Sequence, residues 1–136
     1  MTKKNTYAVE RLLTEVELEL MSIVWSLGPT TVKDVSKQLP KARNLAYTTI
    51  ATVMKILENK GFLTCQKDTH AHVFTPAVSK THYEATCLEH MVNHVFDGEP
   101  MALVQRLIEA KKIQPDDIEI IEKILKKLKT EERSRK

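Results

Sequence analysis

Glycine and proline occur at few positions in this chain, and those positions divide it into separate segments. The 136 residues include only three Gly and five Pro, most of them between runs in which apolar residues recur every three or four positions. This spacing is typical of amphipathic helices. A Gly or Pro between two such runs ends one helix before the next begins. The sequence therefore predicts a chain built mainly of separate helices.

The first half of the chain carries start and stop signals for three helices. Thr14 and Glu17 form a capping box that begins the first helix, and Gly28-Pro29 ends it. Thr31 caps a second, short helix. A third helix is expected over residues 46–60. Three short helices, the second and third joined by a tight link, describe a helix-turn-helix arrangement.

The third helix is followed by a predicted hairpin and then by a second helical region. Residues 62–67 and 72–75 have strand character and flank a polar turn, so they predict a wing beside the helix-turn-helix. From Ser79 on, three segments carry broad apolar arcs with no sheet to cover them. We expect these helices to cover one another across a two-fold axis.

The expected fold class is mostly α with a small β-hairpin: an N-terminal winged helix-turn-helix plus a C-terminal helical dimerisation region. The winged-helix DNA-binding domain is placed at residues 8–78 and the dimerisation domain at 79–130, with 1–7 and 131–136 as disordered tails. The residues expected to form the dimer contact are apolar and lie on the last three helices. They are Tyr83, Leu88, Met91, Val95, Leu103, Leu107, Ile121, Leu125 and Leu128.

Charge and missing motifs narrow the function classes. Residues 1–80 hold eleven Lys/Arg against seven Asp/Glu, whereas 81–136 hold ten against eleven, so the basic half is the predicted DNA-binding half. No apolar run is long enough for a membrane span and no secretory signal is visible, which predicts a cytoplasmic protein without a membrane partner. Phosphate-binding glycine loops, nucleophile elbows and H-E-x-x-H are absent from the sequence. Neither an enzyme nor a cofactor is expected.

The third helix is expected to present a slim, polar face nearly free of acid. Thr48, Thr49, Ala51, Thr52 and Lys55 face outward there. Hydroxyls can donate to or accept from base edges, and small apolar groups can contact the thymine methyl. The residues just before them, Arg43, Asn44 and Tyr47, are further candidate DNA contacts. The alternative is an ordinary solvated face, but threonine is a mediocre helix former, so helix propensity does not explain these residues.

Several motifs, in order and in register, resemble the penicillinase-repressor family of the BlaI/MecI/CopY type. The likeness spans residues 12–128. It rests on Leu13-Thr14-Glu15-Val16-Glu17 with Met21-Ser22-Ile23-Val24-Trp25, on residues 45–54 of the third helix, on Lys60-Gly61-Phe62-Leu63, on residues 74–79 and on Phe96-Asp97-Gly98.

The resemblance implies a homodimeric winged-helix repressor that binds a palindromic operator and blocks transcription, with resistance or stress genes as candidate targets. Its base-reading positions would be Thr48, Thr49, Thr52 and Lys55, and Lys67 and His70 on the wing would contact the DNA backbone. A metalloprotease antirepressor is a further candidate partner. The bond corresponding to the family's cleavage site is Arg106-Leu107, which departs from the Asn-Phe pattern.

Two alternatives stay open at this point. A metal-responsive regulator has Cys87, His90 and His94 as weak candidate ligands on one helix, although a packed thiol and an interfacial imidazole explain them equally well. The paired cysteines of copper-responsive members are missing after Cys87. A protein-interaction module would use the winged helix only as a docking surface.

Overall fold

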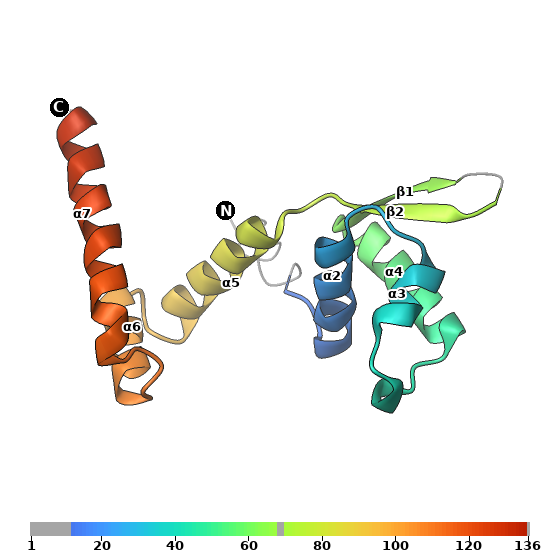
Figure 1. The fold of residues 1–136 in the computed structure, drawn as a ribbon, viewed down its shortest axis with the longest axis horizontal. Coiled ribbons are helices and arrows are strands. Elements are labelled where there is room, and N and C mark those ends of the chain that lie inside the picture. Colours follow the sequence, from blue (N-terminus) through green and yellow to red (C-terminus); the bar gives the residue numbers. More distant parts are fainter. Residues whose placement is uncertain (1–11, 68–69, 136) are drawn as a thin grey trace. The chain divides into compact units, whose positions relative to one another are not determined.

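The computed structural model describes residues 12–67 and 70–135 and contains two compact units, Met1–His90 and Met91–Lys136. The first unit holds α2 (Glu15–Leu27), α3 (Val32–Gln38), η1 (Lys41–Arg43), α4 (Tyr47–Asn59), β1 (Leu63–Lys67), β2 (His72–Pro76) and most of α5 (Lys80–His94) (Figure 1). The second holds α6 (Pro100–Glu109), η2 (Pro115–Asp117) and α7 (Ile118–Arg135). The expected fold class, mostly α with one hairpin, is confirmed.

The predicted helix caps are present. Thr14 Oγ1 accepts a hydrogen bond from the Glu17 N–H at 3.2 Å, and Glu17 Oε1 accepts one from the Thr14 N–H at 2.9 Å, which completes the capping box of α2. Thr31 Oγ1 accepts from the Asp34 N–H at 3.2 Å at the start of α3. Gly61 has a φ of 89° just after α4, a backbone conformation that favours glycine. Local signals therefore place the ends of these helices.

The hairpin is joined to the helical part by one more pair of backbone hydrogen bonds. Strands β1 and β2 are antiparallel, with Cys65 opposite Phe74 and Lys67 opposite His72. Thr30, in the loop after α2, exchanges two hydrogen bonds with Phe74, at 2.9 and 2.7 Å. This bridge ties the middle of β2 to the α2–α3 loop. The periodicity of the sequence does not reveal this contact.

A single apolar core in the first unit holds α2, α3, α4 and the hairpin together. Its largest fully buried side chains are Leu20, Met21, Val24, Val35, Ile50, Met54, Leu57 and Leu63. They recur at three- and four-residue spacing on the helices, as an amphipathic pattern predicts. Phe62, Phe74 and Tyr83 close the cluster from the hairpin and α5. This packing leaves only one side of α4 available to solvent.

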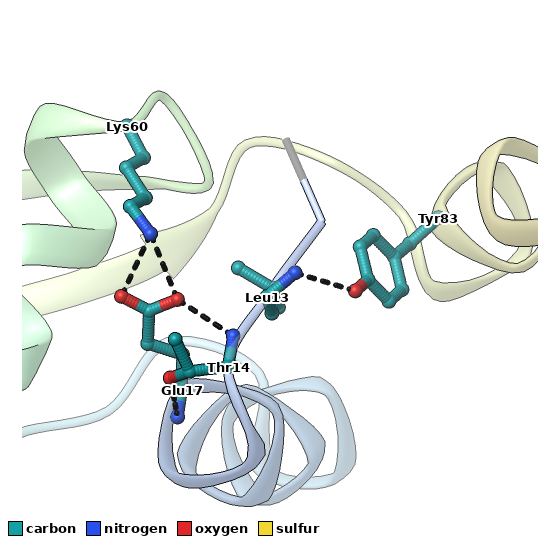
Figure 2. Close-up of polar contacts among 5 residues, drawn as sticks. All are labelled: Leu13, Thr14, Glu17, Lys60 and Tyr83. Atoms are coloured by element: carbon teal, nitrogen blue, oxygen red, sulfur yellow. Dashed lines mark hydrogen bonds and ion pairs between the residues drawn. The ribbon is translucent and has the colours of Figure 1, made fainter. Parts of the chain in front are cut away.

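Glu17 is an almost buried carboxylate that joins α2 to the end of α4 (Figure 2). Its two oxygens lie 2.8 and 2.9 Å from Lys60 Nζ, and the Thr14 N–H donates to one of them. Burial raises the pKa of Glu17, but hydrogen bonds from Lys60 and the Thr14 N–H, with the charge of Lys60, outweigh it. The net result is a pKa below the ordinary value of 4.5.

The division between the two units falls within α5 and not before it. Tyr83 is only 7% exposed, and Cys87 packs against the same core, so the first turns of α5 belong to the N-terminal unit. The sequence predicted the boundary at 78/79 because the helical pattern changes there.

The sequence also predicted a disordered tail at 131–136, but α7 continues to Arg135. Lys, Glu and Arg favour helix, and no Gly or Pro interrupts this stretch. The expected tail at 1–7 lies outside the described residues.

Side chains of the second unit remain largely exposed. Among the described residues after Tyr83, none is buried. Exposed fractions reach 62% at Ile124, 60% at Leu128 and 67% at Met101. In a single chain, α6 and α7 therefore expose apolar surface of the kind that usually marks a protein–protein interaction site.

Replacing Lys60 by Met tests the Glu17–Lys60 pair. We expect the free energy of unfolding at pH 7 to fall by about 1–3 kcal/mol, because a desolvated carboxylate loses its donor. A carboxyl group with a lower pKa in the folded chain than in the unfolded chain stabilises the fold at pH values above the unfolded pKa. This stabilisation is lost as the pH falls through the pKa of the folded chain. The difference between wild type and variant should therefore shrink below about pH 4.5. Urea denaturation at pH 7, 5 and 4 measures it. Lys37→Met, at an exposed lysine, should show no such pH-dependent difference.

Candidate nucleic-acid interface

Helix α4 divides cleanly into a buried side and an outward side. Ile50, Met54 and Leu57 are fully buried, whereas Thr48, Thr49 and Thr52 are exposed. Ala51 was expected on the outward side, but it is partly buried against the core. At 100° per residue, Ala51 falls at the edge of the apolar arc, not on the face centred between Thr48 and Thr52. Threonine hydroxyls and methyls therefore form the middle of the outward face, and Tyr47, Lys55 and Ile56 are also exposed on this helix.

One hydroxyl on this face already has a partner. Thr52 Oγ1 donates to the Thr48 carbonyl oxygen at 2.9 Å. With its hydrogen used in the helix, the Thr52 oxygen can still accept a hydrogen bond while its methyl group faces outward. Such a side chain suits an exocyclic amino group or a thymine methyl. The side chains of Thr48 and Thr49 are exposed as well.

Charged candidates near this face are partly neutralised. Arg43 Nε lies 2.7 Å from Glu19 Oε1, and Lys55 Nζ lies 3.2 Å from Glu58 Oε1. The Arg43 pair fixes η1 against α2 and leaves the terminal guanidinium nitrogens as further possible donors. Lys55 is still well exposed, with 58% of its side chain accessible. Each of these two cations therefore has an acid beside it.

The start of α4 supports an approach to phosphate. Its N-cap is Ala46, which provides no side-chain cap, and its first turn contains no acid. Tyr47 is 57% exposed there. Unpaired N–H groups and the positive end of the helix dipole favour an anion. Asn44 has a φ of 48°, a left-handed conformation that Asn tolerates, so the local turn already explains this residue type.

A groove of about 580 Å³ runs between α4, the start of α3 and the hairpin. Val32, Ala51 and Phe74 contribute apolar or partly buried surface to it. The other residues that line it are Thr31, Lys33, Tyr47, Lys55, His70, Ala71 and His72. The groove lies directly beside the threonine face, because Tyr47, Ala51 and Lys55 follow one another at four-residue spacing on α4. A strand of nucleic acid next to α4 would meet these side chains.

The structure brings together most of the residues that were expected to bind DNA. Thr48, Thr49, Thr52, Lys55 and Tyr47 share one exposed helix. His70 lines the groove, and Lys67 is exposed at the end of β1 opposite His72. Sequence reasoning did not name His72, and it left open whether Lys33 contacts phosphate or is an ordinary solubilising lysine. Lys33 lies on the outward side of α3, but only the folded chain shows that this side faces α4 and the hairpin.

Other candidate residues fall elsewhere. Within the described part of the chain, no group of three His, Cys, Asp or Glu side chains is arranged to hold a metal ion. Cys87 packs against the core of the first unit. Arg106 and Leu107 lie inside α6, where Arg106 pairs with Glu109. A protease would require this helix to open locally before cutting the bond between them.

Comparison with known proteins gives this geometry a context. The sequence model of one family, described as penicillinase repressor, matches residues 13–127. The chain belongs to the penicillinase repressor family. It is 25% identical to the penicillinase repressor of Bacillus licheniformis over 117 residues, which cover 86% of this chain and 91% of that protein. It is 24% identical to the methicillin resistance regulatory protein MecI of Mammaliicoccus sciuri, over 85% of this chain and 94% of that protein.

A solved structure is also similar. It is the DNA-binding domain of the repressor BlaI. The match covers 52% of this chain and 87% of that domain, with 30% sequence identity and a TM-score of 0.47. Membership of the family makes this chain a DNA-binding transcriptional repressor and not an enzyme. Across residues 12–67 and 70–135, no helix combines the length and apolarity that crossing a membrane requires.

Lys33→Gln tests the groove as part of the interface. We expect the variant to bind all duplex sequences more weakly by a similar factor and to lower the slope of log affinity against log salt by about 1, because one phosphate contact is lost. Fluorescence anisotropy over a salt series measures this slope. Lys37→Gln, on the same helix but outside the groove, should leave the slope unchanged. Equal effects from the two variants would show that only net charge matters.

Proposed function

We propose that this repressor acts as a homodimer that binds a palindromic operator and blocks transcription by occupying the promoter. Each protomer places α4 in a major groove, with Thr48, Thr49 and Thr52 against base edges. The groove beside α4, lined by Lys33, Lys55 and His70, takes the sugar–phosphate backbone.

The outward face of α4 is the observation that carries this proposal. Three exposed threonines lie on a helix whose opposite side is fully buried, so the helix is held rigidly while its polar side stays accessible. The face is slim between Thr48 and Thr52 because no aromatic or long apolar side chain is exposed there, and the exposed Tyr47 and Ile56 lie before and after this stretch. A helix that enters the major groove has to approach base edges closely, and such a face permits it.

Exposed apolar surface on the C-terminal helices supports the homodimer. Leu88 and Met91 on α5, and Val95 just after it, are 51%, 44% and 65% exposed, and α7 adds Leu125 and Leu128. The expected contact residues Leu103, Leu107 and Ile121 are partly buried. Tyr83, expected in the same contact, is enclosed in the first unit, so the proposed dimer surface omits it. A two-fold dimer would bury this surface and pair two α4 helices with a palindrome.

The relatives suggest which genes are controlled. One is called a penicillinase repressor and another a methicillin resistance regulatory protein. We therefore propose resistance or stress genes as targets, with a cytoplasmic repressor acting at their promoters. Induction by a metalloprotease antirepressor would have to open α6 around Arg106 and Leu107.

Thr48→Ala and Thr52→Ala test the reading face. We expect each to cost about 1–3 kcal/mol of discrimination against the wrong base pair, because a base-edge contact disappears. An operator is first selected from a random duplex library with the wild-type chain, and competition binding then compares it with single-base variants. Thr130→Ala is the matched control, because Thr130 makes the same hydrogen bond to the carbonyl four residues earlier, at 3.0 Å, on α7. Full discrimination in both α4 variants would refute the assignment.

Leu125→Glu tests the dimer surface. We expect the dimer dissociation constant to rise at least roughly tenfold, because two carboxylates would enter an apolar contact. Sedimentation over a concentration series measures it. Thr130→Glu makes the same change in charge on the opposite side of α7 and should leave association unchanged. If wild type sediments as a monomer at micromolar concentration, the homodimer proposal is wrong.

A further inference from the structure

Helix α5 connects the DNA-binding unit to the helices proposed to form the dimer. It begins at Lys80 in the first unit, and its last residues, Met91 to His94, belong to the second. Any dimer contact beyond His90 reaches the winged helix through this one segment. The direction in which α5 leaves the first unit is therefore a mechanical property of the repressor.

Two hydrogen bonds tie the root of α5 to opposite ends of α2. The Trp25 Nε1–H, near the end of α2, donates to the Val78 carbonyl oxygen at 2.8 Å, just before α5 begins. The Leu13 N–H, just before α2 begins, donates to Tyr83 Oη, also at 2.8 Å (Figure 2). A single hydrogen bond would fix one point at the start of α5 and leave α5 free to rotate about that point. Two hydrogen bonds, one to each end of α2, also fix the direction of α5.

Packing holds the same two side chains in place. The centroid of the Tyr83 ring lies 5.7 Å from that of the Trp25 ring, with 38° between the ring planes. It also lies 5.7 Å from the centroid of the Phe62 ring, in a nearly edge-on arrangement with an interplanar angle of 74°. Burial raises the pKa of Tyr83 to about 12, so its hydroxyl stays neutral and remains a constant partner for the Leu13 N–H. The rings and the hydrogen bonds together enclose the first turn of α5.

We propose that Tyr83 and Trp25 are positioning residues that fix the direction of α5 and thereby set the spacing at which the repressor accepts two operator half-sites. This inference rests on the proposed function, because spacing has a meaning only for a dimer on a two-part operator. Neither residue contacts the DNA in this scheme. Each acts through α5 on the separation and relative rotation of the two α4 helices.

DNA geometry makes the effect measurable. Inserting one base pair between half-sites moves them apart by about 3.4 Å and rotates them by about 34°. A dimer with rigid α5 roots cannot follow that rotation and loses one half-site contact. A dimer with loosened roots follows it at less cost. Loosening should therefore broaden spacing tolerance while leaving the affinity for a single half-site unchanged.

Tyr83→Phe removes the hydroxyl and keeps the ring, and Trp25→Phe removes the indole N–H. Full-length wild type and variants are titrated against the selected operator, against versions with one base pair added or removed between half-sites, and against a duplex with one half-site. We expect the affinity of wild type for the native spacing to exceed its affinity for the altered spacings by about tenfold or more. For each variant this ratio should fall to about two- to threefold, a change of the size that the loss of one hydrogen bond produces. Half-site affinity should stay within about twofold of wild type.

Val35→Ala is the control for a general loss of stability. It removes fully buried apolar contacts on α3 in the same unit and takes part in neither tie. We expect it to lower the melting temperature and to keep the wild-type spacing preference. Retained half-site binding shows that a variant is folded. Tyr83→Phe and Trp25→Phe each remove a different tie, so the two ties are tested independently.

Two results would overturn the inference: unchanged spacing preference in both Tyr83→Phe and Trp25→Phe, or equal broadening by Val35→Ala. Failure of the proposed function looks different. Wild type would then bind no duplex selectively, or would bind a single half-site as tightly as the whole operator, and the inference would fall with it.

Discussion

The thirteen residues of α4 must provide both an apolar side that packs in the core and a polar side that stays accessible. The rest of the first unit supports both requirements. One side must be apolar enough to hold the helix in the core, where Ile50, Met54 and Leu57 are fully buried. The other must stay slim and polar so that it can lie against another molecule. Rigid support from a close-packed core lets small side chains act at defined positions, because their reach is too short to compensate for a badly placed backbone.

The Glu17–Lys60 pair shows how a charge can be placed inside such a support. A carboxylate that is 6% exposed is costly unless donors surround it. Glu17 has Lys60 at both oxygens and the Thr14 N–H at one of them, so the same side chain completes a helix cap and joins two helices. Because the cap and the ion pair share one carboxylate, the start of α2 and the end of α4 are fixed together.

Local signals in the sequence were sufficient for most elements of the fold. The caps at Thr14 and Thr31 and the breaks at the glycines are decided by residues close in the chain, and the structure has them where the sequence predicts them. Contacts between distant residues were not predictable in this way. The Thr30–Phe74 bridge and the hydrogen bond from Leu13 to Tyr83 join residues 44 and 70 positions apart, and no periodicity encodes either.

The same distinction applies to the candidate site. The threonine face of α4 could be read from the sequence because one helix contains all of it. The groove could not, since it forms only when α3, α4 and the hairpin come together and bring Lys33 near His70 and His72. Tyr83 looked like part of a dimer contact because its spacing continues the apolar arc of α5. Its enclosure against Trp25 and Phe62 depends on the fold of the whole unit.

The lack of buried residues after Tyr83 in the described part of the chain has a consequence for how the repressor responds to its own abundance. Helices that bury little surface alone gain too little from apolar contacts to offset the entropy of ordering. If a second copy supplies the missing contacts, ordering and pairing become one equilibrium, and mass action links both to concentration. Occupancy of a promoter would then rise more steeply than linearly with the amount of protein. A modest fall in its supply would release the gene sharply.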